Sequence, residues 1–536
     1  MTEKTKLSMD YILLALMVIF ITLQPYFKHG VLNYYELGIY LPCIDAVFQG
    51  GVPYKDIFIA RGPLEIYIPT FLMQIFGKNI AVLEGYFYFG TVLTLIICVF
   101  LGKQLYRTRL FTYLMALVLV AKTFARVNFN NWGGIRFGMG ILAILFAIMF
   151  FKKEKYRWIF LSGISAALGL FISYEIGIFS AAAIIIALIF LKERYKAVSY
   201  FLLGFVVIIG PFLFYFYLNK ALMPYLDAFF KLVINGTNNA FDMPSLLGSP
   251  RNLKEFISAF SPFNHNIKYM PAFFLYAGVF CCMAWRFFKK KFTKRDLMVI
   301  CISIYGPLMY YGAFRDIEGP QYEMALQPAI IIAYLFLEKL FMFCKARKRV
   351  ITYSVIFMII GISIIYPIQR FQKRFFIIKY AKEYFLEKKG VKIIFSEESY
   401  VKLDIERAKG IVVPLQQAEE IEGVTEYIQK NTKPEEYVFT FPDLGIYNFL
   451  ADRPMPGRFK TAMYSWAYPE NHAELMKALR DQKPAIIINR KRYPEIEPFL
   501  PKVKSYMDEV YSYVSAKYTL VKNFGNIEVY EKKGKI

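Results

Sequence analysis

The chain contains little histidine and little cysteine. Its three histidines, His29, His265 and His472, do not have the spacing of metal ligands, which argues against a histidine-based zinc site. None of the six cysteines follows Cys344, so the sequence does not support a disulfide-stapled C-terminal domain. The chain also lacks a fixed-period repeat, a low-complexity tract and a glycine-rich phosphate loop. Repeat scaffolds and nucleotide enzymes built on such a loop are therefore excluded.

Apolar residues, by contrast, are abundant. They make up 57% of the 536 residues, with a mean hydropathy of +0.38, which indicates membrane helices rather than several soluble cores. Repeated continuous runs of about 17–22 residues match the length that spans a hydrocarbon core of roughly 30 Å. Continuous runs fit helices and not a β-barrel. The first run lacks a small-residue cleavage site, so we expect it to be retained as a helix. The eleven predicted spans lie near residues 10–27, 80–102, 110–126, 136–151, 158–173, 175–191, 198–218, 269–288, 296–313, 323–343 and 350–367.

The net charge of +24 raises the question of nucleic-acid binding, but its distribution excludes it. Between two and six Lys or Arg residues lie in each of the short loops 1–9, 103–109, 152–157, 192–196, 286–295 and 345–349. This bias predicts that these loops and the N-terminus are cytoplasmic. An odd number of spans then places the C-terminal region on the exterior, periplasmic face of the cell (inner) membrane.

Residues 1–369 are therefore expected to form a transmembrane domain with two long exterior loops, 28–79 and 219–268. Residues 370–536 change pattern, because short β-rich runs alternate there with polar helical segments, and they predict a soluble exterior α/β domain. The expected strands are Val391–Phe395, Tyr437–Phe441 and Ala485–Asn489, the expected helices are 471–482 and 495–512, and the expected hairpin pairs 517–522 with 527–531.

With this orientation, unusual polar residues gather in four exterior turns. A plain explanation is that exterior loops hold the acids that inner loops exclude. The alternative is that these turns form a site. In such a site, one set of residues would bind the molecule that is modified or would support the reacting side chains: Asn130, Arg136, Tyr174, Glu175, Asp316 and Glu318. The turns contain Glu36, Asp56 and Arg61; Asn130 and Arg136; Tyr174 and Glu175; and Arg315, Asp316 and Glu318.

The run from Gly38 to Gln49 predicts a short interfacial helix. Ile39, Leu41 and Ile44 share one helical face, and the run is too short to span the bilayer. Such a helix would hold Glu36 and Asp56 near its two ends, at headgroup depth. A lipid-linked substrate presents its phosphate at that depth.

This placement suits transfer of a sugar from a lipid phosphate. A carboxylate can take the proton of the acceptor hydroxyl, and Glu36 is the candidate base. The departing phosphate needs a cation, for which Arg61, Lys55 and Arg315 are candidates, or a divalent metal ion such as Mg or Mn held by carboxylates. Asp56 could orient the acceptor or the metal ion.

Simpler roles stay open for the same residues. Glu36 and Asp56 could cap a helix or be solvated in the loop, and Arg61 and Lys55 could contact lipid headgroups. Arg315 and Asp316 could form a local ion pair, and Glu175 could be a solvated turn residue.

The first exterior loop resembles that of GT-C glycosyltransferases. The resemblance lies in Glu36-x-Gly38-Ile39-Tyr40, Asp45-Ala46, Gly51-Val52-Pro53-Tyr54-Lys55-Asp56 and Gly62-Pro63-Leu64 with Tyr67. The loop is most similar to that of the polyprenyl-phosphate-sugar-dependent branch related to protein O-mannosyltransferases and aminoarabinose transferases. Arg315-Asp316 resembles an Arg-Asp element of a late exterior loop in bacterial members.

The resemblance implies a membrane enzyme that inverts the anomeric carbon, with Glu36 as the base. It also implies a polyprenyl-phosphate-linked sugar donor, a glycan, lipid or protein acceptor, and membrane lipids as partners. Two positions depart from the family pattern. Leu37 stands where a second acid is common, and Gln321 and Tyr322 stand near the place of a late-loop histidine.

The sequence leaves two other functions open. A transporter or flippase for a lipid-linked sugar would place acids or Arg near the midplane of its spans and would show internal repeats. The polar clusters lie instead at span ends. A non-catalytic partner in glycan assembly is the third possibility, which Leu37 keeps open.

Overall fold

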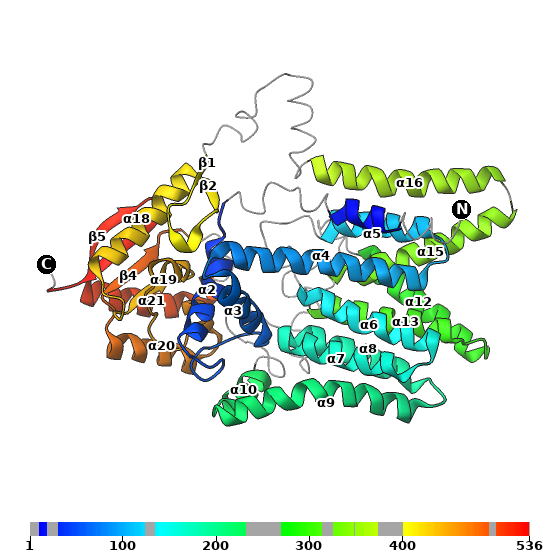
Figure 1. Ribbon diagram of the computed structural model, residues 1–536, viewed down its shortest axis with the longest axis horizontal. Helices are drawn as coiled ribbons and strands as arrows, with labels where there is room; N and C mark the ends of the chain where they lie inside the picture. Colours follow the sequence, from blue (N-terminus) through cyan, green and yellow to red (C-terminus); the bar gives the residue numbers. More distant parts are fainter. Residues whose placement is uncertain are drawn as a thin grey trace, which may run out of the picture. The chain divides into compact units, whose positions relative to one another are not determined.

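A computed structural model describes residues 10–18, 31–123, 135–231, 270–312, 325–347, 349–372, 400–492 and 500–534. The chain divides into two compact units, a helical unit and a mixed unit (Figure 1). The helical unit consists of Met1–Phe27, Phe87–Phe212 and Asn252–Ile394. The mixed unit consists of Lys28–Tyr86, Leu213–Arg251 and Phe395–Ile536, so it combines the first long loop with the C-terminal region.

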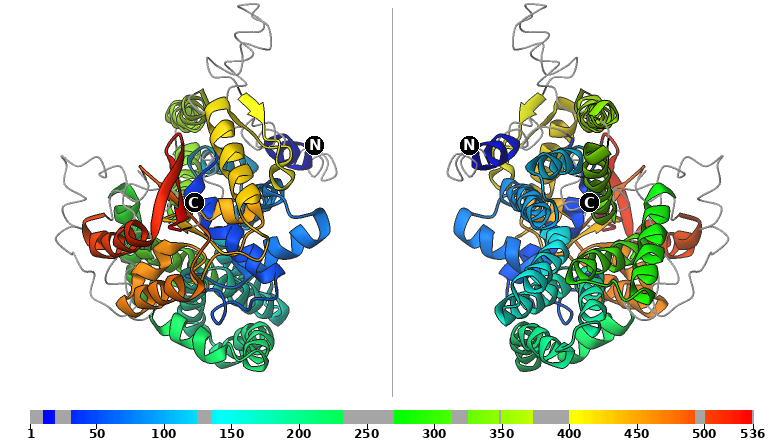
Figure 2. Two further views of the ribbon diagram at one scale, coloured as in Figure 1. Left: turned by 90° about the vertical axis from the view of Figure 1, so that its left-hand side faces the viewer. Right: turned by 90° about the vertical axis from the view of Figure 1, so that its right-hand side faces the viewer.

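Long helices make up the described part of the helical unit. Most of them run roughly parallel in Figure 1, and Figure 2 views them nearly end-on. Within the described residues, five helices are long and apolar enough to cross a membrane. Ten described helices, including these five, coincide with the second to eleventh predicted spans, and residues 10–18 of the first span are also helical. The helices are α4 (Ile80–Leu105), α5 (Arg109–Thr123), α6 (Ile135–Lys153), α7 (Tyr156–Ile172), α8 (Tyr174–Ile189), α9 (Arg194–Leu218), α12 (Met270–Phe288), α13 (Lys294–Gly312), α15 (Gln327–Arg347) and α16 (Arg349–Gln372).

The basic loops of the helical unit contact one another. Asp10 forms ion pairs with Lys103 (3.3 Å) and Arg109 (3.4 Å), and Glu154 pairs with Lys294. These contacts bring together loops that the charge pattern assigns to one side of a membrane. The side of the membrane that they face stays a prediction.

The C-terminal part of the mixed unit is the predicted α/β region. Its main sheet has the strand order β3-β4-β6-β5, in which β3 and β4 are parallel and the other pairs are antiparallel. The predicted strands at 437–441 and 485–489, the helix at 471–482 and the terminal hairpin are confirmed to within a few residues. The helix predicted at 495–512 is described from Leu500 and continues to Lys517, and the strand predicted at Val391–Phe395 lies outside the described residues. The elements are β1 (Tyr400–Lys402), η8 (Glu406–Ala408), β2 (Val412–Pro414), α18 (Leu415–Asn431), β3 (Val438–Phe441), α19 (Ile446–Ala451), η9 (Ala462–Ala467), α20 (Pro469–Gln482), β4 (Ile486–Arg490), α21 (Leu500–Lys517), β5 (Tyr518–Phe524) and β6 (Ile527–Lys532).

The first loop contributes α2 (Tyr34–Phe48) and α3 (Leu64–Phe76), and residues 222–229 form α10 (Leu222–Phe229). Helix α2 begins four residues before the predicted start, because the Asn33 side chain caps it by accepting a hydrogen bond from the Glu36 backbone N–H (3.2 Å). The predicted helix had one apolar face, but α2 is buried nearly all round from Tyr34 to Asp45.

Two glycines explain how α2 becomes so deeply buried. Helix α19 packs against α2, and a Cβ atom added at Gly38 would lie 2.1 Å from the backbone oxygen of Asp443. Pro42 has no N–H to bond the Gly38 carbonyl. A Cβ atom added at Gly445 would lie 2.5 Å from that same carbonyl oxygen. Only glycine at these two positions lets the backbones approach this closely.

Candidate functional site

Glu36, the predicted base, is buried in the first turn of α2, with 7% of its surface exposed. The N-terminus of a helix carries partial positive charge, which stabilises a carboxylate in the first turn. Tyr40 lies one turn further along α2, so both side chains project from the same side of the helix. This local geometry brings a carboxylate and a phenol together inside the mixed unit.

Arg61 contacts the side chains of Tyr40 and Glu65. Its Nη1 donates to the Tyr40 hydroxyl (2.7 Å) and pairs with Oε1 of Glu65 (3.3 Å). Glu65 lies four residues after Arg61 at the start of α3, and it is 5% exposed. The predicted phosphate ligand Arg61 is thus held by a carboxylate of its own loop.

Tyr35 and Tyr464 complete what we call the Glu36 cluster: Tyr35, Glu36, Tyr40, Arg61, Glu65 and Tyr464. Burial raises the pKa of each of the three tyrosines; the Glu36 carboxylate raises it further, and Arg61 opposes this. The phenols are therefore protonated and can donate hydrogen bonds.

The surroundings of Arg61 keep its guanidinium protonated. Burial opposes the guanidinium charge, but Glu65, Tyr40, Tyr464 and Glu36 more than offset burial and raise the pKa of Arg61 well above its ordinary value. The cluster contains two acidic side chains and one guanidinium. A further anion would have to compete with Glu65 for that guanidinium.

Lys55 and Asp56 lie in the turn that follows α2 and are both exposed. An Asp56 carboxylate oxygen accepts a hydrogen bond from the Val52 N–H (2.9 Å), and Lys55 lies 3.9 Å from Asp56. Asp56 also contributes to the electrostatic environment of the partly buried Lys460. Its described contacts are those of a turn residue, and its catalytic role stays a prediction.

The structure brings two predicted residues, Arg136 and Glu175, together in the helical unit. Arg136 is buried and donates to Ser173 Oγ (3.1 Å) and to Glu175 Oε2 (3.2 Å). Tyr174, the first residue of α8 and the sequence neighbour of both Ser173 and Glu175, is also buried. The contacts of Arg136 therefore join the start of α6 to the α7–α8 turn, and a role of these residues in binding the acceptor stays a prediction. Asn130, Arg315, Asp316 and Glu318 lie outside the described residues.

Sequence reasoning did not select Tyr40, Glu65 or Tyr464. The first two had a usable signal, because Tyr40 lies four residues after Glu36 and Glu65 four residues after Arg61, the spacing of neighbours on a helix. Tyr464 lies about 400 residues from the first loop, and no local pattern links it to Glu36.

The divalent cation suggested by the sequence finds no cluster of acidic, histidine or cysteine ligands in the part of the chain that the structure describes. There, no three His, Cys, Asp or Glu side chains gather so that they could hold an ion. In the Glu36 cluster, the Glu65 carboxylate already forms an ion pair with the Arg61 guanidinium, with which a metal ion would have to compete. A divalent cation stays a prediction, since Asp316 and Glu318 lie outside the described residues.

No protein-family model and no curated protein matches the sequence. Several solved structures match the fold, and two of them match it over almost the whole chain. These two are of ArnT from Cupriavidus metallidurans, one bound to undecaprenyl phosphate and one in the apo state. The bound structure gives a TM-score of 0.53 and covers 99% of each chain, and the apo structure gives 0.54 with 99% of this chain and 98% of ArnT. Identity is 12% in both, so the likeness concerns the fold. It confirms a polytopic α-helical membrane protein with a C-terminal α/β region.

Proposed function

We propose that this protein is a membrane glycosyltransferase that moves a sugar from a polyprenyl-phosphate donor to an acceptor at the exterior face of the membrane. The fold supports the lipid-linked donor, because one of the ArnT structures that share it is bound to undecaprenyl phosphate. The first loop supports it independently through its resemblance to that of GT-C transferases.

Glu36 is the proposed general base, and its buried position in the Glu36 cluster is the observation that carries the proposal. The carboxylate takes the proton of the acceptor hydroxyl while that oxygen attacks the anomeric carbon. The bond from the anomeric carbon to the phosphate oxygen breaks, and polyprenyl phosphate leaves. Attack from the face opposite the phosphate inverts the anomeric carbon.

Arg61 supports this role as a positioning residue. Its fixed charge beside Glu36 favours the ionised carboxylate, and its contacts with Tyr40 and Glu65 tie α2 to the start of α3. A phosphate at Arg61 has to share the guanidinium with Glu65. Lys55 and Arg315 stay further candidates for the phosphate, and Arg136 and Glu175 for the acceptor.

Reconstituted protein tests the proposal. Proteoliposomes would receive a radiolabelled polyprenyl-phosphate sugar in one leaflet, together with a membrane extract as the source of acceptor. The proposal expects label in an acceptor product and the release of unlabelled polyprenyl phosphate. Movement of intact labelled lipid between leaflets without product would contradict the proposal and identify a flippase.

A further inference from the structure

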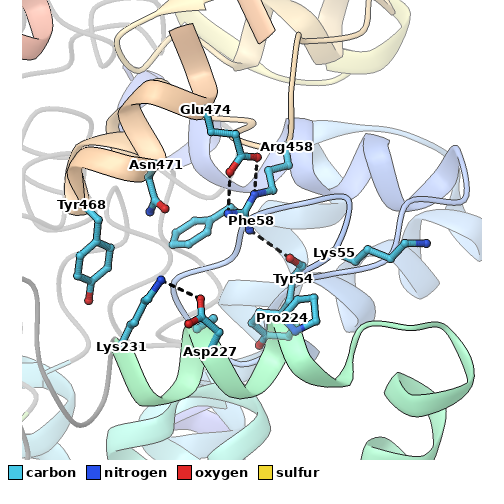
Figure 3. A pocket seen from close by; sticks show the side chains of 11 residues that line it. Tyr54, Lys55, Phe58, Pro224, Asp227, Lys231, Arg458, Tyr468, Asn471 and Glu474 are labelled. Carbon is cyan, nitrogen blue, oxygen red and sulfur yellow. Dashed lines mark hydrogen bonds and ion pairs between the residues drawn. The ribbon is translucent and has the colours of Figure 1, made fainter. Parts of the chain in front are cut away.

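A cavity of about 320 Å³ lies within the mixed unit, at the lower end of the size range of small-molecule sites, roughly 300–1,000 Å³ (Figure 3). Three segments meet around it: the turn after α2, helix α10, and the chain between residues 458 and 474. The lining residues are Tyr54, Lys55, Phe58, Pro224, Asp227, Ala228, Lys231, Arg458, Tyr468, Asn471 and Glu474.

Each charged group around the cavity lies near a group of opposite sign, and the exposed Lys55 lies 3.9 Å from Asp56. Arg458 binds Glu474 through two parallel hydrogen bonds, from Nε to Oε1 (2.7 Å) and from Nη2 to Oε2 (2.9 Å). Lys231 pairs with Asp227 (3.1 Å) and with Glu470 (3.4 Å). A free anion would have to compete with these carboxylates, so the cavity does not select for phosphate.

Asn471 supplies an unsatisfied hydrogen-bond donor. The residue is 5% exposed, and its Nδ2 has no hydrogen-bond partner among the residues that the structure describes. Figure 3 shows its amide directed into the space beside Tyr468 and Phe58. A buried amide left without a partner costs about 1–3 kcal/mol, and a ligand that brings an acceptor oxygen removes that cost.

Aromatic side chains supply the remaining surface. The Phe58 ring lies beneath the Arg458 guanidinium, 5.7 Å from its carbon, and the half-buried Tyr468 stands across from it in Figure 3. Aromatic rings offer flat apolar surface, and the paired acids and the amide offer both acceptors and donors. A ring with an apolar face and hydroxyl groups at its edge can pack on the aromatic side chains and hydrogen-bond to the polar ones.

We propose that this cavity binds a neutral saccharide ring, with Asn471 donating to one of its oxygens and Tyr468 packing on its face. A purely apolar ligand would leave Asn471 unsatisfied, and an anionic one would have to displace Asp227 from Lys231 or Glu474 from Arg458. The further statement that this ring belongs to the acceptor rests on the proposed transferase function.

Saturation-transfer-difference NMR on the full-length protein in detergent tests the proposal. The probes are the methyl glycosides of neutral hexoses and N-acetylhexosamines, with inorganic phosphate and a hexose phosphate as anionic arms. We expect saturable binding of at least one neutral glycoside that phosphate does not displace. Asn471→Asp removes the donor and should weaken this binding by about two- to tenfold, the effect of one hydrogen bond. Asn431→Asp makes the same change at an exposed position of α18 and should leave it unchanged.

Three results would overturn the proposal: no neutral glycoside binds, only the phosphate-bearing probes compete, or Asn471→Asp and Tyr468→Leu both bind as well as the wild type. If Asn471→Asp does not fold, as judged by its melting curve, Tyr468→Leu decides alone. Binding of a glycoside by a protein without transfer activity would keep this site and refute the transferase function. Transfer without glycoside binding would refute this site alone.

Discussion

Replacing Gly38 by alanine tests how the mixed unit holds the candidate base. The new Cβ would lie 2.1 Å from the backbone oxygen of Asp443 and 3.1 Å from the backbone nitrogen of Gly445. Real Cβ contacts essentially never fall below 3.0 Å, so α2 and the 443–445 backbone have to separate. The required movement is roughly 1 Å, because neither contact involves a flexible side chain.

The expected cost follows from this geometry. Overpacking of this kind typically destabilises a protein by about 1–3 kcal/mol. A loss of 1 kcal/mol lowers Tm by about 2–4 °C for a unit of 150–250 residues, so we expect a fall of roughly 2–12 °C. Glu36 lies two residues before Gly38 on the same helix. A displacement of about 1 Å at a reacting group can reduce a rate by about 100-fold, and we expect a loss of that order in sugar transfer.

Thermal unfolding in detergent and the transfer assay measure the two effects. Gly278→Ala is the matched control, because Gly278 also lies inside a helix, α12, and no atom lies within 4 Å of an added Cβ. Both substitutions replace a helical glycine by alanine, so the difference between the two variants reports the clash. A Gly38→Ala protein as stable and as active as Gly278→Ala would refute the close approach of α2 to residues 443–445.

Two further predictions concern buried charges. Asp45→Asn should destabilise the protein by about 2–3 kcal/mol, because the buried Asp45 carboxylate binds Lys78 (2.9 Å) and Arg407 (3.3 Å) and both cations are partly exposed. Asp56→Asn, at an exposed turn, should change stability by less than about 0.5 kcal/mol; equal Tm shifts in the two variants would contradict this. Burial lowers the pKa of His472, although Glu509 opposes the shift. The unfolded chain therefore binds the proton more readily, and stability should fall as the pH drops through about 6.5. The Tm of the His472→Gln variant should fall less than that of the wild type between pH 7.5 and 5.5. An equal fall of Tm in the two proteins would contradict the lowered pKa of His472.

The sequence predicted the elements that depend on local patterns. Continuous apolar runs predicted α4 to α9, α12, α13, α15 and α16, but not the short helix α10, and short β-rich runs predicted β3, β4 and the β5–β6 hairpin. The spacing of acids in the first loop selected Glu36, which the structure places in a buried cluster with Arg61.

Contacts between distant segments could not be predicted in this way. The approach of Gly38 to Gly445 joins residues about 400 positions apart, and Tyr464 reaches the Glu36 cluster across a similar separation. Single apolar or aromatic residues carry no information on such partners. Asp45 likewise gives no sign in the sequence that Arg407 will bind it. For this reason α2 was expected to be half-buried at an interface, although the structure surrounds it with protein.

The rate of sugar transfer by Glu36→Gln tests the central claim most directly. Glutamine keeps the size of the side chain and cannot accept the acceptor proton as a carboxylate does. Loss of a general base typically costs 10²–10⁴-fold, so kcat should fall by about that factor while the donor still binds. Glu426→Gln, an exposed position on α18, makes the same change outside the cluster and should retain the wild-type rate. A folded Glu36→Gln protein with full transfer activity would contradict the assignment of Glu36 as the base.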